Sequence, residues 1–329
     1  MSNNPFSNKH LLNLTVKHQS LEASAFNSLD QVLLQDNTAD KLFLTDTISN
    51  KDILTGIYCS VLASIFLGQH FRKKTRPKDQ FSFSYQKLKD HHLELCQKRF
   101  DESSGLLFLI SPEESLLPKA SYWGSAKNQT IAEPAFLSLM ICGLEQLLFI
   151  GGQLNEDVSQ LSDYLEVLTY SMNEQLWDDE YGIYFPKNIS TDKIILSDSI
   201  GGLFPLLADI PDQEQAEALY RTLANNFVQG QHFYFPTESV LDGHETRMVD
   251  PLVNYLLFLG LTRYEFNTTA QALRQHTRHL VDHYGPQRSY DSKRNLSKIN
   301  TESSPNPVID RLLEDFFQAD LIHYSNAPG

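Results

Sequence analysis

Hydrophobic positions along the chain alternate between two kinds of helical segment. Three segments are apolar nearly all round, and each is followed by a segment whose apolar residues recur every three or four positions. The apolar segments are 133–152, 199–210 and 251–261, and the following ones are 157–176, 213–227 and 269–284. A helix that is apolar all round must be covered on every side, whereas a single stripe needs cover on one side. The alternation therefore predicts helical hairpins, each with one helix inside a ring and one outside.

The same pattern extends toward both ends. Segments 50–69 and 84–100 are predicted as a further inner and outer pair, and segments 20–35 and 307–322 as flanking helices. Strand signals are few, and the clearest is the short piece His232 to Pro236. About ten helices favour an all-α barrel of hairpins. We expect an N-terminal extension with a first helix over 1–45 and a single domain over 46–329, because no low-complexity linker separates the hairpins.

One short device recurs between helices, in which an aromatic residue and an acid are followed by polar residues and then by glycine. It appears as FDESSGLLFLI from Phe100, as WDDEYGIYF from Trp177 and more weakly as YDSKRN from Tyr290. Acids beside aromatics are typical of sugar-cleaving sites, but they also fit a solvated hairpin in which Asp bonds its own backbone and Gly takes positive φ. Turn chemistry favours the hairpin interpretation for Asp178 and its neighbours.

Charge and cysteine content narrow the function classes. The formal charge of −14 argues against nucleic-acid and anionic-membrane partners, which need clustered Lys and Arg. Three widely spaced cysteines indicate buried free thiols in a reducing compartment. The sequence has no signal-peptide pattern and no uninterrupted apolar stretch long enough to span a membrane. A cytoplasmic protein is the expectation.

Nucleotide, serine-nucleophile and metal chemistry find no support in the motifs. The sequence has no P-loop, no G-x-G-x-x-G, no G-x-S-x-G and no C-x-x-C. His279 and His283 are four residues apart and could share a metal, but a solvated helix face is the favoured interpretation. No cofactor and no metal are expected.

Several segments together resemble a known family. They are residues 85–115, EPAFLSLMICGLEQLL, LWDDEYGIYF, SIGGLFPLL and VNYLLFLGLTRY. Their order and spacing are similar to the (α/α)6-barrel glycoside hydrolases of family 63 and the related mannosylglycerate and glucosylglycerate hydrolases. The resemblance implies a six-hairpin (α/α)6 toroid. Because about ten helices are counted and six hairpins need twelve, we expect one hairpin to be missing or irregular near the N-terminus. It also implies a small carbohydrate or glycoside as ligand, and hydrolysis of an α-linkage with inversion.

The catalytic positions that the resemblance implies are substituted in this chain. The family's acid follows a Pro-Trp-Glu-Ser-Gly run, which falls on SPEESLLPKAS and places Pro118 at the acid position. The family's base lies in a run that falls on GPQRSYDS and places Arg288 there. Neither Pro nor Arg performs general acid or base chemistry near neutral pH. Nearby acids that could take over are Glu113, Glu114, Asp242, Glu245, Asp250 and Asp291.

The candidate site follows from this alignment. Glu114, Asp250 and Asp291 are the catalytic candidates, although Glu114 also fits a surface pair at a helix start. The candidate sugar contacts are Trp123, Trp177, Tyr184, Arg247, Asn254 and Arg288. Two functions remain open. The chain either hydrolyses a small α-glycoside or is a catalytically inactive barrel that binds a sugar or a protein partner.

Overall fold

A computed structural model describes most of the central part of the chain. The described residues are 57–72, 82–124, 129–197, 199–228, 234–239, 248–285, 289–291 and Phe316. Helices dominate this part, and the strands are all two residues long. The all-α prediction is confirmed.

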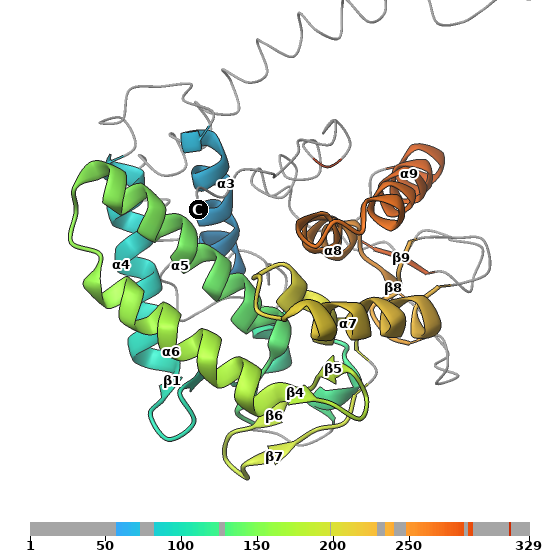
Figure 1. The fold of residues 1–329 in the computed structure, drawn as a ribbon, viewed down its shortest axis with the longest axis horizontal. Helices are drawn as coiled ribbons and strands as arrows, with labels where there is room; N and C mark the ends of the chain where they lie inside the picture. The colour runs from blue at the N-terminus through green and yellow to red at the C-terminus, as the bar shows by residue number, and fades with distance from the viewer. Residues whose placement is uncertain are drawn as a thin grey trace, which may run out of the picture.

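Four successive hairpins of an inner and an outer helical element make up the described fold (Figure 1). The inner elements are α3 (Ile57–Arg72), α5 (Pro134–Leu154), η5 (Ile200–Leu206) and α8 (Pro251–Arg263). The outer elements are α4 (Ser82–Arg99), α6 (Ser159–Leu176), α7 (Gln213–Asn226) and α9 (Asn267–Tyr284). Each pair matches a hairpin that the apolar pattern predicts.

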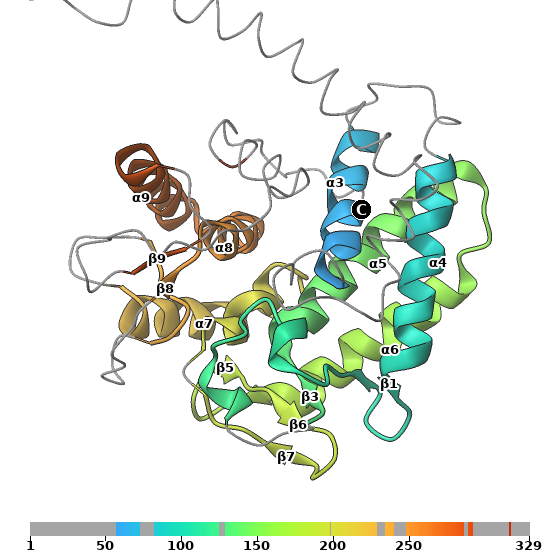
Figure 2. The same cartoon turned by 180° about the vertical axis from the view of Figure 1, so that it is seen from behind.

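The inner elements form a continuous wall. The helix α5 packs against α3 on one side and η5 on the other, and η5 in turn packs against α8. Figures 1 and 2 show α5 lying between α3 and the outer helix α6. Most residues of α5 and α8 are buried, whereas α6, α7 and α9 each bury one stripe. Inner helices are therefore apolar nearly all round, whereas outer helices have apolar residues on one face.

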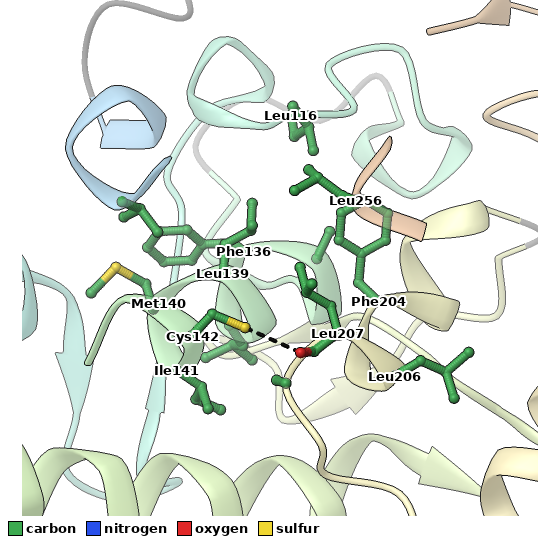
Figure 3. Packing of buried hydrophobic residues seen from close by; sticks show 14 of the residues in the cluster. Leu116, Phe136, Leu139, Met140, Ile141, Cys142, Phe204, Leu206, Leu207 and Leu256 are labelled. Carbon is green, nitrogen blue, oxygen red and sulfur yellow. Dashed lines mark hydrogen bonds between the residues drawn. The ribbon is translucent and has the colours of Figure 1, made fainter. Parts of the chain in front are cut away.

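The core is continuous across this wall. In Figure 3, apolar side chains of α5 lie beside those of η5 and α8, and the thiol of Cys142 donates to the carbonyl of Leu207 at 3.4 Å. Within the described residues, α5 is the one helix apolar and long enough to cross a membrane, but 72% of its most apolar window is buried inside the protein. Its composition is therefore explained by its central place in the core.

One inner segment differs from its prediction. The run 199–210 is not an α-helix but the 3-10 helix η5, followed by a turn. Gly201, Gly202 and Pro205 lie inside it, and these are the residues that disfavour an α-helix. A side chain at Gly202 would collide with the backbone oxygen of Tyr184. The lack of a side chain at Gly202 therefore lets the neighbouring hairpin of β4 (Trp177–Asp178) and β5 (Ile183–Tyr184) pack closely against η5.

Short strands join the helical hairpins. The pairs are β1 (Phe100–Asp101) with β2 (Leu106–Leu107), β4 (Trp177–Asp178) with β5 (Ile183–Tyr184), β6 (Lys187–Asn188) with both β3 (Ile131–Ala132) and β7 (Lys193–Ile194), and β8 (Met248–Val249) with β9 (Tyr290–Asp291). Gly105 and Gly182 take positive φ in the first two hairpins, and Asp101 and Asp178 accept backbone N–H groups there. The tight-turn interpretation is confirmed for both.

One strand prediction is wrong in the described residues, and one turn prediction stays untested. Only the first two residues of the turn predicted from Tyr290 are described, and they form β9, which pairs with the distant β8. The described part of the predicted strand at 232–236 is irregular, because its backbone is held by Asn254 rather than by a strand partner. The predicted helices at 20–35 and 307–322 lie outside the described residues, apart from Phe316, which is buried against Tyr255.

Candidate functional site

Glu114 is held by the fold rather than presented to a ligand. It ends the 3-10 helix η3 (Pro112–Glu114). Its Oε1 lies 2.6 Å from Nη2 of Arg99, and its Oε2 accepts the backbone N–H of Ile110 at 2.9 Å. Both carboxylate oxygens are therefore engaged in contacts that fasten the loop before Pro118 to the end of α4.

Asp250 and Asn254 also carry structural hydrogen bonds. Asp250 is the N-cap of α8, and its Oδ1 accepts the N–H of Leu252 at 2.8 Å. The fully buried Asn254 accepts the N–H of Phe235 at 2.8 Å and donates to the oxygen of the same residue at 3.1 Å. These bonds anchor the described segment 234–239 to α8, as a strand partner otherwise would.

The two aromatic candidates of the β4–β5 hairpin belong to the turn. Trp177 is half-buried and donates its indole N–H to Asp179 at 2.5 Å. Tyr184 is buried and donates its hydroxyl to Asn173 at 2.6 Å. Burial raises the pKa of Tyr184, so its hydroxyl stays protonated. Trp177 thus stabilises the turn itself, and Tyr184 joins the hairpin to α6.

Five candidates have side chains that lie outside what the structure describes. Arg247 and Arg288 fall outside the described residues, as do Asp242 and Glu245. For Asp291 only the backbone is described, which pairs with Met248 in the β8–β9 ladder. The roles of these residues stay predictions.

Sequence reasoning missed a buried carboxylate at the start of α5. Glu133 is fully buried and is the N-cap residue of that helix, yet its side chain does not cap it. Its Oε1 accepts the hydroxyls of Ser115 at 2.9 Å and Tyr122 at 2.5 Å. A buried carboxylate is tolerated when hydroxyl donors replace its water. The sequence signal was a Glu directly before a helix-starting Pro134.

A second buried carboxylate, Glu238, was also missed. It is 8% exposed and lies in the segment 234–239. Its Oε2 is 3.5 Å from the hydroxyl of Ser121, which in turn is 3.3 Å from the hydroxyl of Ser197. Glu238 also forms a β-bridge with Ser199. Loop burial leaves no periodic signal, so nothing in the sequence pattern distinguished this acid.

The two carboxylates meet at one short element, the 3-10 helix η4 (Ser121–Trp123). Ser121 contacts Glu238, and the next residue, Tyr122, contacts Glu133. Trp123 is 4% exposed, and its indole N–H has no acceptor among the described residues. One predicted site residue, Trp123, thus follows directly in the chain the two residues that contact acids which the sequence did not single out.

Metal and thiol chemistry find no support in the described residues. No group of three His, Cys, Asp or Glu side chains there is arranged to hold a metal ion. The rings of His279 and His283 are 6.0 Å apart on α9. Burial raises the pKa of Cys96 to about 12 and raises that of Cys142 as well, so neither thiol is a ready nucleophile.

Similar solved structures define the architecture. An uncharacterized conserved protein from Thermus thermophilus superposes with a TM-score of 0.68 at 15% identity, over 82% of this chain and 79% of that chain. A family 63 mannosylglycerate hydrolase from the same organism, in complex with glucose, gives a TM-score of 0.66 at 16% identity, over 82% and 76% of the two chains. The same enzyme with Tris and D-glycerate gives 0.62 at 15% identity, over 78% and 76%. These likenesses establish the (α/α)6 toroid.

Family membership rests on a sequence match. No curated protein is a significant match to the chain. A family model described as the mannosylglycerate hydrolase MGH1-like glycoside hydrolase domain matches residues 56–296, which is most of the chain. The chain belongs to this family of glycoside hydrolase domains.

Proposed function

We propose that the protein binds a small uncharged sugar or glycoside and does not hydrolyse it with the acid and base pair of its family. The ligand occupies the toroid, and no cofactor or metal takes part. The strongly acidic chain has no nucleic-acid or membrane partner in this proposal, and it acts in the cytoplasm.

The loss of a working general acid carries this proposal. Pro118 stands where the family places its acid, and it has no group that transfers a proton. The acid nearest in the same loop is Glu114, whose two oxygens are engaged by Arg99 and by the backbone N–H of Ile110. Both oxygens are therefore taken up by structural contacts, which leaves neither in position to reach a leaving group.

Polar groups around η4 support sugar binding. Ser121 is exposed and contacts Ser197 and Glu238. Hydroxyl and carboxylate groups at the edge of an apolar wall are the kind of polar groups that fix a small ligand's orientation. One structure with the same fold was solved with glucose bound.

A second candidate function is inverting hydrolysis by a relocated pair of carboxylates. The observation that favours it is the placement of Glu133 and Glu238 against neighbouring residues of η4. Inverting enzymes use two carboxyl groups about 6.5 to 9.5 Å apart on either side of the scissile bond. In this case Glu133→Gln and Glu238→Gln would each abolish turnover.

The two candidates separate in a paired experiment on the full chain. D-glucose, D-mannose and their methyl α-glycosides are titrated while the melting temperature is followed. Binding raises the melting temperature in proportion to the logarithm of ligand concentration. The same glycosides, together with α-mannosylglycerate, are then incubated with the protein and assayed for released reducing sugar. We expect stabilisation without release, whereas release that is lost in Glu238→Gln would establish the relocated hydrolase.

A further inference from the structure

Helix α8 turns opposite faces toward different parts of the molecule. Gly260 lies against η5, because a side chain there would collide with the backbone at the end of η5. An α-helix turns by about 100° per residue, so Tyr255 and Phe258 lie about 140° and 160° round α8 from Gly260. Both side chains are nevertheless buried, with 3% and 4% exposed. This second face of α8, defined by Tyr255 and Phe258, is therefore covered by something other than η5.

Phe316, far along the chain, lies on the second face of α8. Its side chain is fully buried, and its ring centroid is 5.2 Å from that of Tyr255 and 5.3 Å from that of Phe258. Residues three apart are neighbours on one side of a helix, so Phe316 contacts two adjacent side chains of α8. Helix α9 reaches the same face at Phe258, where Cζ of Arg274 is 5.9 Å from the ring centroid. Three aromatic rings in contact provide a specific apolar anchor.

The sequence around Phe316 has the pattern of an amphipathic helix. The backbone of Phe316 itself is helical. Apolar residues near it recur at spacings of three and four, as Ile309, Leu312, Leu313, Phe316 and Ala319. A helix over 307–322 would be roughly 24 Å long, and α8 is roughly 20 Å long at the same rise per residue. One helix could therefore cover the other along most of its length.

The place of this face in the fold favours a segment of the same chain as its cover. Helix α8 is the last inner element of the described wall, and it packs against η5 and the outer helix α9. The family model ends at residue 296, before the predicted helix at 307–322 begins. A segment tethered to the same chain docks intramolecularly, so its docking does not depend on protein concentration. The burial of Phe316 against α8 is the observed contact of such a segment.

We propose that residues 307–322 dock as one amphipathic helix on the second face of α8, with Phe316 as the anchor, and that this helix continues the inner wall of the toroid. Its apolar stripe then lies over Tyr255 and Phe258. Arg311, Glu314 and Gln318 fall on the opposite side of the helix and stay in water. This docking goes beyond the proposed function and does not depend on a bound ligand.

Hydrogen exchange of the full chain, followed by mass spectrometry on peptides from 307–322, tests the docking. An isolated helix of this length is marginal in water, so strong protection of its amides requires packing against the rest of the protein. We expect these amides to exchange at least about 100-fold more slowly than those of an unstructured peptide. Exchange at the unstructured rate throughout 307–322 would overturn the proposal.

Substitutions on both sides of the contact identify the docking face. In the full chain, Phe316→Ala is expected to speed exchange in 307–322 by about tenfold or more, because the anchor is lost. Phe258→Leu alters only α8 and keeps its apolar volume, yet it is expected to speed exchange in 307–322 by about threefold, because an aromatic pair is lost. The matched control is Phe266→Leu, which removes a stacked contact with Tyr220 and leaves exchange in 307–322 unchanged.

The remaining outcomes decide what covers the second face of α8. Protection of 307–322 that neither Phe316→Ala nor Phe258→Leu reduces would show that the segment docks elsewhere, which overturns the proposal. Protection that disappears on dilution, together with a dimer in sedimentation velocity at high concentration, would show that the helix comes from a second copy and would overturn intramolecular docking. Protection that is independent of concentration and is lost in Phe316→Ala, with exchange in α5 unchanged, supports it.

Discussion

Replacing Glu114 by Gln tests whether this acid is a structural clamp. The carboxylate joins the end of α4 to the loop that carries Pro118, through Arg99 and the backbone N–H of Ile110. Gln has nearly the same shape but no charge, so the substitution removes the ion pair with little change in packing. If Glu114 were a general acid, the same change would abolish turnover instead.

The expected loss of stability follows from the geometry. The Arg99–Glu114 contact is 2.6 Å long, and the two side chains are 18% and 21% exposed. A hydrogen bond between charged groups contributes about 1.5–3 kcal/mol. The side-chain oxygen of Gln can still accept one of the two hydrogen bonds, but its NH2 group then faces the other donor and loses that bond. Because water partly screens the pair, we expect the free energy of unfolding to fall by about 1–2 kcal/mol.

Urea unfolding followed by circular dichroism measures this difference. The matched control is Glu113→Gln, a neighbour on the same 3-10 turn, which is expected to change stability by less than about 0.5 kcal/mol. A double-mutant cycle with Arg99→Gln isolates the pair, with an expected coupling of about 1 kcal/mol. Unaltered stability of Glu114→Gln, or a coupling of zero, would refute the clamp.

Three further predictions concern the wall and its anchors. Gly143→Ala places a methyl group 2.5 Å from Nε2 of the buried His92 and is expected to destabilise the fold by about 1–3 kcal/mol in thermal melts. The control is Gly152→Ala, whose methyl group meets nothing within 4 Å. Burial, aided by the charge of His91, lowers the pKa of His92 from 6.5 to about 3. As the pH falls, the unfolded chain binds a proton at His92 before the folded chain does. The free energy of unfolding is therefore highest above about pH 6.5 and decreases toward pH 3 by up to about 1.4 kcal/mol per pH unit. Unfolding titrations from pH 7 to 5 check this, and a His92→Leu variant with an equally steep loss contradicts it. Asn254→Ala leaves the buried backbone N–H and oxygen of Phe235 without their hydrogen bonds and is expected to lower the free energy of unfolding by about 2–4 kcal/mol. The loss should appear as faster amide hydrogen exchange in 234–239, and unchanged exchange would rule out this anchor.

The sequence predicts the helical hairpins well because their burial is periodic. The outer helix α9 buries Ala270, Leu273, Thr277 and Leu280, which lie on the stripe that the spacing indicates. The inner helices are covered on both sides and so are apolar nearly all round. The exception is η5, whose apolar run is the same but whose glycines and Pro205 shorten it to a 3-10 turn. Hydrophobicity identifies an inner element, while backbone chemistry decides its conformation.

The candidate site is predicted far less well, because motif position does not reveal what a side chain contacts. Glu114, Asp250 and Asn254 align with or lie near family site residues, yet their described contacts are to Arg99 and to backbone groups. Glu133 and Glu238 lie in connections, where burial depends on the packing of distant segments and has no local signature. The role of Trp123 as a sugar contact stays a prediction, and the lack of an acceptor for its indole N–H among the described residues could be seen only in three dimensions.

Saturation-transfer NMR on the full chain with methyl α-D-glucopyranoside, methyl α-D-mannopyranoside and α-mannosylglycerate tests the central claim most directly, because one sample reports both binding and cleavage. The account predicts saturation transfer to the ring protons of a neutral glycoside, with anomeric signals that stay constant over days. The appearance of free reducing-sugar signals, or the lack of any transfer across all three compounds, would contradict it.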